Sequence, residues 1–358
     1  MKVALITNMP VPYRIPVYSK VTNVSLKVFF CTDKETNRKW ILKNLDFEHE
    51  FLKKSFKGNK DGYNFTHNNP DIWSKLNSYN PDTVITTGFN PTHLYAFVWT
   101  LLKRKKHICM TDGTIYTESS LSFVHKIIRK FVFRYTSAFI AASESGISLY
   151  KSYGICKDKI FKSELCIDNY IYNRLSNSIN RQYDVCFSGQ IQDRKSPLFF
   201  ASVCNEIMNI RGSCTALILG DGPLKDELLT QLEKDNISYH YPGFVQQEKL
   251  PSYYSDTKLL LFPTTLDAWG VVVNEAMAAG TPVITTNFSG AANEVVINNH
   301  TGYVLDLSVH DWASSAVSIL DDRKKWMSLS NECKKKISSY NYNSAANGIE
   351  HACLFAAE

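Results

Sequence analysis

Residues 259–305 read LLLFPTTLDAWGVVVNEAMAAGTPVITTNFSGAANEVVINNHTGYVL. The apolar run that ends at Phe262 is typical of a buried parallel strand, and a helix is predicted from Gly270 to Ala279. The first amides of a helix have no acceptor within the helix, and the helix dipole is positive at that end. We therefore expect a phosphate to bind at the amides of Gly270, Val271 and Val272.

Glu275 lies five residues further on, roughly 7.5 Å along the helix axis from Gly270. A carboxylate can accept hydrogen bonds from two neighbouring hydroxyls, which suits a ribose beside a diphosphate. The alternative is a solvated helix glutamate, which is common in proteins generally. The position of Glu275 between Asn274 and the apolar AMAAG stripe favours the ribose contact.

Short apolar segments alternate with helical ones along both halves of the chain, which indicates an α/β fold with two doubly wound parallel sheets. A length of 358 residues suits two domains. We expect one α/β domain at residues 1–170 and a second at 181–335. A C-terminal helix at 336–358 is expected to cross back to the first domain. The polar segment 169–182 is the predicted linker.

Composition excludes several classes of protein. Hydrophobic residues make up 44% and charged residues 21%, as in globular proteins. No run reaches the roughly 20 apolar residues of a membrane-spanning helix, and we expect a cytoplasmic protein. The nine cysteines include no CxxC pair, so no metal site or cofactor is expected. The net charge of +6 indicates that the chain binds an anionic surface. Nucleic acid is not favoured as that surface, because no nucleic-acid recognition module is present.

The stretch from Leu259 resembles the donor-site signature of glycosyltransferase family 4, and the resemblance extends over most of the chain. These are retaining enzymes of the GT-B fold, in which two Rossmann-like domains face a central cleft, and the chain resembles the bacterial surface-polysaccharide type. The resemblance implies that residues 1–170 form the acceptor-binding domain and residues 181–335 the nucleotide-sugar-binding domain. The family carries two acidic residues separated by seven others, which correspond to Asp267 and Glu275. The first is usually glutamate, so Asp267 is one methylene shorter for its implied contact with the donor sugar. The alternative for Asp267 is a loop aspartate that begins a helix.

FSGQIQDRKSPLFF, at residues 187–200, resembles the family segment in which an arginine and a lysine hold the donor diphosphate. Lys195 occupies the lysine position, whereas Gln190 stands where arginine is usual and removes one charge-assisted contact. Arg194 could compensate from the same loop. The alternative for Arg194 and Lys195 is a pair of solvated charges before a helix.

Two further segments resemble supporting parts of the donor site. In LILGDGPLKDELL, at residues 217–229, Gly220 and Gly222 allow a tight turn from strand to helix. In the segment that follows, the resemblance implies that backbone groups of Phe244 and Val245 pair with a nucleobase, usually a pyrimidine. An ordinary surface turn is the alternative.

In the N-terminal half, Asp112 follows a predicted strand, at the sheet edge where ligands gather in open α/β folds. The family resemblance gives it a role in contacting the sugar or orienting the acceptor, against the alternative of a turn aspartate. Tyr13 and Arg14 lie in the proline-stiffened loop NMPVPYRIPVY and are expected to contact acceptor or phosphate, with a surface charge as the equal alternative for Arg14.

Residues 122–135 are amphipathic at helical spacing, and the neighbouring run at 103–106 is basic. Apolar residues Val124, Ile127, Phe131 and Tyr135 would form one side, and Lys126, Arg129, Lys130 and Arg134 the other. Such a helix can lie on an anionic membrane, and the chain is then peripheral on the inner face of the plasma membrane. A core-facing helix with a solvated basic side explains the same spacing.

The resemblance implies a retaining transferase that moves a sugar from a nucleotide diphosphate donor, a UDP-sugar, onto a glycan or lipid-linked glycan in polysaccharide biosynthesis. Two alternatives stay open. The first is a nucleotide-sugar epimerase or sugar phosphorylase of the same fold, although no lysine motif for pyridoxal phosphate is recognised. The second is a nucleotide-sugar-binding module without catalysis, which the changes at Gln190 and Asp267 suggest.

Overall fold

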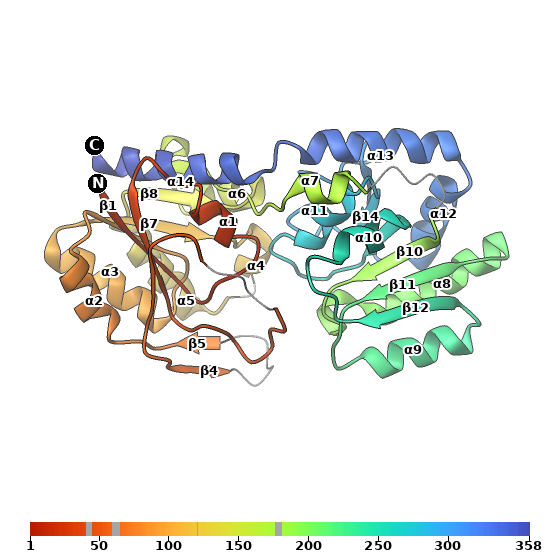
Figure 1. Ribbon diagram of the computed structural model, residues 1–358, viewed down its shortest axis with the longest axis horizontal. Helices are drawn as coiled ribbons and strands as arrows, with labels where there is room; N and C mark the ends of the chain where they lie inside the picture. The colour runs from red at the N-terminus through yellow and green to blue at the C-terminus, as the bar shows by residue number, and fades with distance from the viewer. Residues whose placement is uncertain (41–44, 59–64, 120, 176–180) are drawn as a thin grey trace. The chain divides into compact units, whose positions relative to one another are not determined.

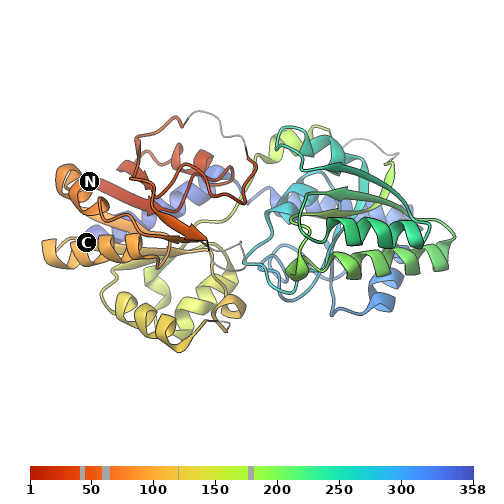
Figure 2. The same cartoon turned by 90° about the horizontal axis from the view of Figure 1, so that it is seen from below.

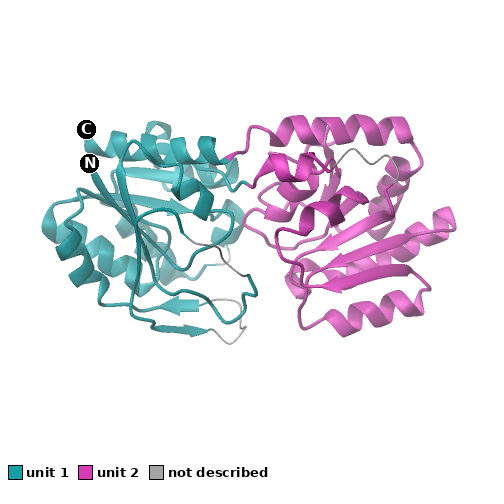
Figure 3. Cartoon of the chain, viewed as in Figure 1, with its two compact units in different colours: residues 1–166, 342–358 teal, residues 167–341 magenta. Residues whose placement is uncertain are grey.

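The computed structural model describes residues 1–40, 45–58, 65–119, 121–175 and 181–358. Two compact units are present, one formed by residues 1–166 with 342–358 and the other by residues 167–341 (Figure 3). Each unit is an α/β domain around one parallel sheet. The chain therefore leaves the first unit once and returns to it with its last helix.

The first unit holds a sheet in the order β3-β2-β1-β6-β7-β8-β9, with every described pair parallel. Its strands are β1 (Lys2–Thr7), β2 (Ser25–Phe30), β3 (His49–Phe51), β6 (Thr83–Thr86), β7 (Lys106–Thr111), β8 (Ala138–Ala141) and β9 (Ile160–Lys162). A separate antiparallel pair joins β4 (Phe56–Gly58) to β5 (Phe65–His67). The chain reverses its direction of travel across the sheet between β1 and β6, which creates a switch point there.

Helices cover both faces of this sheet (Figures 1 and 2). They are α1 (Ile15–Tyr18), α2 (Ile72–Tyr79), α3 (Pro91–Lys103), α4 (Ile115–Ser119), α5 (Phe123–Arg134), α6 (Glu144–Ser152) and α14 (Tyr342–Ala357). Ala4 and Ile6 pack with α2 and α3, and alternation along β1 turns Val3 and Leu5 to the opposite face. Helix α14 packs on strands β6 to β9.

The second unit repeats the plan with the order β12-β11-β10-β13-β14-β15. Its strands are β10 (Tyr183–Ser188), β11 (Thr215–Leu219), β12 (Ser238–Gly243), β13 (Thr257–Phe262), β14 (Val283–Thr285) and β15 (Gly302–Val304). Its helices are α7 (Asn169–Asn173), α8 (Pro197–Arg211), α9 (Lys225–Lys234), α10 (Leu250–Ser255), α11 (Val271–Ala278), α12 (Val309–Leu320) and α13 (Arg323–Ile337). The switch point lies between β10 and β13.

The core of the second unit explains why these segments become strands. Alternate residues of β10, Val185 and Phe187, are fully buried together with Phe200 of α8 and Trp312 of α12. Because both faces of the sheet are covered at its centre, β10, β11 and β13 carry consecutive buried apolar residues rather than an alternating pattern. This burial holds the ends of β10 and β13 side by side, where the candidate site lies.

The fold class predicted from the sequence is confirmed, since two doubly wound α/β units are observed. Five of the described strands were not predicted. Each has only three residues and, unlike the equally short β14, is not buried along its whole length, so it shows neither a period nor a continuous apolar run; the five are β3, β4, β5, β9 and β15. The segment predicted as a linker contains α7, whose Tyr172 is buried beside Tyr254 at 6.2 Å between ring centroids. Part of the predicted linker, residues 176–180, lies outside the described residues.

Candidate functional site

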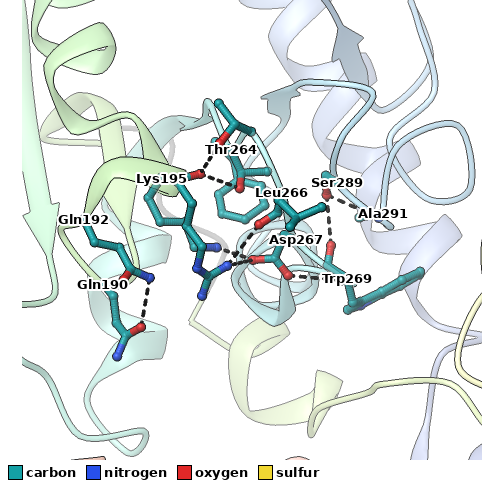
Figure 4. Close-up of polar contacts among 12 residues, drawn as sticks. Gln190, Gln192, Lys195, Thr264, Leu266, Asp267, Trp269, Ser289 and Ala291 are labelled. Carbon is teal, nitrogen blue, oxygen red and sulfur yellow. Dashed lines mark hydrogen bonds and ion pairs between the residues drawn. The ribbon is translucent and has the colours of Figure 1, made fainter. Parts of the chain in front are cut away.

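The carboxyl ends of β10 and β13 bring Lys195 and Asp267 together in the second unit (Figure 4). Lys195 ends a short 3-10 turn, Asp193–Lys195, after β10, and Asp267 lies in the loop after β13. The Lys195 ammonium donates to Asp267 Oδ2, and Arg194 Nη1 lies 3.5 Å from the same oxygen. Both cations predicted for the diphosphate thus meet the carboxylate predicted for the sugar.

The Asp267 carboxylate is held on its other side as well. Its Oδ1 accepts a hydrogen bond of 3.0 Å from the backbone amide of Trp269. Burial alone would raise the pKa of Asp267, but the nearby Lys195 and Arg194 outweigh burial and place the pKa below its usual value. Asp267 is therefore ionised at neutral pH, and its position is fixed before any ligand binds.

Lys195 lies against an apolar wall rather than in open solvent. Its side chain is 8% exposed, and the ammonium sits 4.3 Å from the centroid of the Phe262 ring. Burial lowers the pKa of Lys195, while the carboxylate of Asp267 opposes that shift. The alternative of a solvated surface charge is wrong for Lys195. Arg194, whose side chain is 43% exposed, also donates to the Leu266 carbonyl at 3.0 Å.

Gln190, at the position where the resembling family has arginine, is bonded within its own loop. Its side-chain oxygen accepts from the Gln192 amide at 3.1 Å (Figure 4). The loop that carries it is pressed against the turn after β11, where a side chain on Gly220 would come within 1.8 Å of the Gly189 carbonyl oxygen. Gly220 also has a φ of 137°, so glycine is required there.

Helix α11 begins where the sequence predicts, with Gly270 as its N-cap. Gly270 has a φ of 96°, and a side chain there would lie 2.6 Å from the Phe262 ring. The amides of Val271 and Val272 lie in the first turn, where the helix supplies no acceptor. Glycine thus lets the helix start close to the end of β13 and the Lys195 ammonium.

Glu275 belongs to a second polar cluster and makes no hydrogen bond or ion pair with Asp267 in the described part of the chain. The residue is 6% exposed, and its Oε2 accepts from the Tyr254 hydroxyl at 3.0 Å. The same hydroxyl lies 2.7 Å from Ser188 Oγ at the end of β10. Burial raises the pKa of Glu275 to about 7, although hydrogen bonds from Tyr254 and Tyr172 oppose the shift. The alternative of a solvated glutamate is wrong.

Sequence reasoning missed the partners Ser188, Tyr254 and Tyr172 of this cluster. Tyr254 lies 21 residues before Glu275, so no local spacing connects the two. Only Ser188 carried a sequence signal, because it ends a buried strand at the edge of the sheet where ligands gather. Phe244 and Val245 lie in the loop after β12, half-buried, at the same carboxyl edge of the sheet.

Asp112 lies in the first unit, after β7, and is not part of either cluster. Its Oδ1 accepts from Arg14 Nη2 at 2.7 Å. Arg14 is 3% exposed, so the surface-charge alternative for it is wrong. Its other nitrogen donates to Ser163 and Glu164 near the end of β9. The two residues line a cavity of about 180 Å³.

Helix α5 presents most of its predicted apolar side to solvent. Its core contacts are made by Ile128, Val132 and Phe133, and Phe131 also meets the buried Phe97 ring edge-on at 6.0 Å between centroids. The exposed apolar side chains are Phe123, Val124, Ile127, Phe131 and Tyr135, each between 49% and 76% exposed. Arg129 departs from the predicted basic side, because it pairs with Glu118 at 2.5 Å and lies over the Phe89 ring.

The described ranges contain neither a helix that could span a membrane nor a cluster of metal-binding side chains. No helix there combines the length and apolar character needed to cross a membrane. No group of three or more His, Cys, Asp and Glu side chains in the same ranges is arranged to hold a metal ion.

Comparison with known proteins connects the second unit to a family. Residues 173–336 match the model of the family described as glycosyl transferases group 1. The chain is 29% identical over 129 residues to 2-deoxystreptamine N-acetyl-D-glucosaminyltransferase of Niallia circulans, which covers 36% of this chain and 33% of that protein. It is 25% identical over 152 residues to UDP-Gal:alpha-D-GlcNAc-diphosphoundecaprenol alpha-1,3-galactosyltransferase of Escherichia coli, which covers 42% and 39%.

The chain thus spans 33% of the length of the first relative and 39% of the second. It spans 66% of the uncharacterized 41.2 kDa protein in the cps region of Klebsiella pneumoniae, to which it is 25% identical. The structural likeness extends further. The crystal structure of Anabaena Alr3699/HepE in complex with UDP and glucose superposes with a TM-score of 0.76 at 15% identity and covers 99% of both chains. The chain therefore has the two-domain GT-B fold.

Proposed function

We propose that this chain is a retaining glycosyltransferase that moves a sugar from a UDP-sugar onto a glycan or lipid-linked glycan in polysaccharide biosynthesis. The observation that carries the proposal is the meeting of Lys195, Arg194 and the start of α11 at the switch point of the second unit. This is the position at which open α/β sheets bind ligands. The match of residues 173–336 to glycosyl transferases group 1 supports it.

The proposed donor contacts all lie in the second unit. The diphosphate binds Lys195, Arg194 and the amides of Gly270, Val271 and Val272. Because Lys195 and Arg194 face Asp267 in the unliganded chain, an arriving diphosphate competes with that carboxylate for both cations. Glu275 accepts hydrogen bonds from the ribose, and the backbone of Phe244 and Val245 pairs with the base. UDP is the favoured nucleotide because HepE was crystallised with UDP.

The chemistry needs stabilisation of the negative charge that develops on the leaving diphosphate. Lys195 lies in a largely buried position, where an ammonium interacts more strongly with an anion than it does in water. The leaving phosphate takes the proton of the acceptor hydroxyl, so no dedicated side-chain base is needed. Asp267 contacts the donor sugar, and Asp112 of the first unit orients the acceptor.

The exposed face of α5 fits an anionic membrane surface, which would hold the chain on the inner face of the plasma membrane. Apolar and basic side chains are both exposed on this helix, including Phe123 at 76% and Val124 at 62%. An amphipathic helix of this kind buries its apolar side chains at the lipid boundary while its cations meet phosphate head groups. A lipid-linked acceptor would be reached from this position.

A donor screen tests the proposed function. The protein is incubated with UDP-, GDP- and dTDP-sugars, and nucleotide release is measured with and without extracts that contain lipid-linked glycans. We expect release from a UDP-sugar that an acceptor accelerates, and a product whose anomeric configuration matches the donor by NMR. Conversion of the donor into an epimer, or donor binding without turnover under all conditions, would refute transferase activity.

A further inference from the structure

Tyr340 lies between the last two helices of the chain, after α13 and just before α14, and belongs to the second unit. The residue is 6% exposed. Its hydroxyl donates to Glu294 Oε1 at 2.9 Å, and its carbonyl oxygen accepts from the side-chain amide of Asn169 at 3.0 Å. Because both the backbone and the hydroxyl of Tyr340 are bonded, the position of its ring is fixed.

The Tyr340 ring stacks on the indole of Trp269, with 5.7 Å between the ring centroids and 23° between the planes. Trp269 lies in the loop between β13 and α11 and is 1% exposed. Its indole nitrogen donates to Asn274 Oδ1 of α11 at 2.8 Å. Its carbonyl oxygen accepts from the Ser289 hydroxyl at 2.9 Å (Figure 4). Trp269 is therefore held by α11, by the loop at Ser289 and by the stacked ring of Tyr340.

Trp269 in turn holds the carboxylate of the candidate donor site. Its backbone amide donates to Asp267 Oδ1 at 3.0 Å, while Asp267 Oδ2 faces the Lys195 ammonium (Figure 4). The backbone around Trp269 is closely packed, because a side chain on Gly290 would come within 2.0 Å of the Ala268 carbonyl oxygen. A shift of the Trp269 backbone therefore moves the amide that fixes the Asp267 carboxylate.

Ordinary core packing is the alternative for this stack, since aromatic side chains dominate protein cores. The geometry favours a positioning role, because Trp269 follows Asp267 by two residues and bonds its carboxylate directly. Residues 263–270, all of which the structure describes, form no helix or strand, and one isolated bridge joins Asp267 to Ser289. Side-chain contacts such as the stack with Tyr340 therefore help to fix this loop.

We propose that Tyr340 is a positioning residue for donor recognition: its ring fixes Trp269, and the Trp269 amide holds the Asp267 carboxylate in place for the donor sugar. The contact of Asp267 with the sugar rests on the proposed function. The link from Tyr340 to the Asp267 carboxylate does not, so the two can be tested apart. Because the proposed diphosphate contacts are Lys195, Arg194 and the amides of α11, a change at Tyr340 should affect recognition of the sugar rather than of the nucleotide.

The link is tested by NMR on the full chain labelled with ¹⁵N-tryptophan and ¹³C-carbonyl alanine. Ala268–Trp269 is the one alanine–tryptophan pair in the sequence, so the Trp269 amide is assigned without a mutation. Asp267→Asn removes the charged acceptor and marks where the amide resonance lies without the carboxylate. Tyr340→Leu and Tyr340→Met replace the ring by apolar chains that do not stack, and should move the resonance toward that position. Tyr340→Phe keeps the ring and should leave the resonance near its wild-type position.

Titration calorimetry then measures recognition of the donor, with UDP and with the UDP-sugar that is turned over in the donor screen. Tyr340→Leu should weaken UDP-sugar binding about tenfold, the loss expected for one hydrogen bond to a charged group, and leave UDP affinity unchanged. Tyr340→Phe should keep the wild-type ratio of the two affinities. The matched control is Tyr303→Leu, which removes a half-buried tyrosine of the same unit that lies under Lys325 and should change neither readout.

Thermal unfolding shows which variants are folded, and Tyr340→Met and Tyr340→Phe keep the test valid if Tyr340→Leu does not fold. The inference is overturned by a Trp269 amide that stays in place in folded Tyr340→Leu or Tyr340→Met, or that moves equally in Tyr340→Phe or Tyr303→Leu. Equal losses of UDP and UDP-sugar affinity would also overturn it, because a merely structural role leaves their ratio unchanged. Nucleotide release with an unmoved Trp269 amide refutes the positioning role alone, whereas the expected amide shifts without release refute the transferase alone.

Discussion

The ammonium of Lys195 and the carboxylate of Asp267 form a largely buried ion pair between residues 72 positions apart in the chain. Arg194 adds a second cation to the same carboxylate oxygen at 3.5 Å. A diphosphate that binds here must replace an interaction that already exists. The energetics of donor binding therefore include the cost of loosening this pair.

Replacing Asp267 with Asn should destabilise the unliganded chain and strengthen its response to nucleotide. Removing one partner of a buried pair leaves Lys195 uncompensated, which costs about 3 kcal/mol of unfolding free energy. UDP would then restore the missing negative charge, so the rise in melting temperature on adding UDP should exceed that of the wild type. Thermal unfolding with and without UDP measures both effects. Asp226→Asn, at an exposed ion pair, is the control, and an unchanged UDP response would show that Asp267 and diphosphate do not compete.

Lys195 and Arg194 should contribute unequally to donor affinity. Lys195→Met removes a charge-assisted contact from a site that is 8% exposed, and we expect UDP binding to weaken by about 2–3 kcal/mol. Arg194→Met acts at a side chain that is 43% exposed, where solvent screens the interaction, and should cost under about 1 kcal/mol. Isothermal titration with UDP distinguishes the two. Equal losses would mean that both cations contact the diphosphate to the same extent.

Glu275 should make both donor binding and stability depend on pH near neutrality. Its pKa is raised from 4.5 to about 7 in the folded chain, so the contribution of Glu275 to stability is fully present below pH 4.5 and is lost as pH rises through 7. Ribose hydroxyls donate better to the ionised form, so UDP affinity should increase over the same range. Glu275→Gln should flatten both profiles, and Glu275→Ala should weaken UDP binding by about 1–3 kcal/mol.

Melting temperature and UDP affinity are measured between about pH 5.5 and 8.5, which extends about 1.5 pH units on either side of the raised pKa of Glu275. Glu233→Gln provides the matched control, since Glu233 is an exposed carboxylate bonded to Tyr239. A wild-type profile that parallels the Glu275→Gln profile would show that Glu275 titrates elsewhere.

The exposed face of α5 should determine binding to anionic vesicles. We expect weaker binding to phosphatidylserine vesicles when Lys126, Lys130 and Arg134 are all changed to Gln. At about 1 kcal/mol for each cation, the loss is about 3 kcal/mol, or roughly a hundredfold. Arg129 is left intact because it pairs with Glu118 and serves the fold. Vesicle sedimentation makes the measurement. The control changes the exposed Arg323, Lys324 and Lys335 of α13 to Gln, and an equal loss there would indicate a general charge effect.

The sequence alone was sufficient for the α/β class, the two-sheet organisation and the start of α11 at Gly270. These features follow from local rules, because buried parallel strands are apolar over several residues and a helix start leaves a composition signal. A strand of three residues carries no such signal unless it is apolar and fully buried, as β14 is, and β3, β4, β5, β9 and β15 were missed for that reason.

The environment of each candidate side chain was decided only by the tertiary structure. Sequence spacing places Asp267 and Glu275 in one motif, yet Asp267 pairs with Lys195 and Glu275 with Tyr254. Glu35 and His67, which are 32 residues apart, meet only because the first unit brings their segments together. Contacts between distant residues depend on how strands and helices pack. The burial and the neighbouring groups that set the pKa of Glu275 arise from that packing and not from any local pattern.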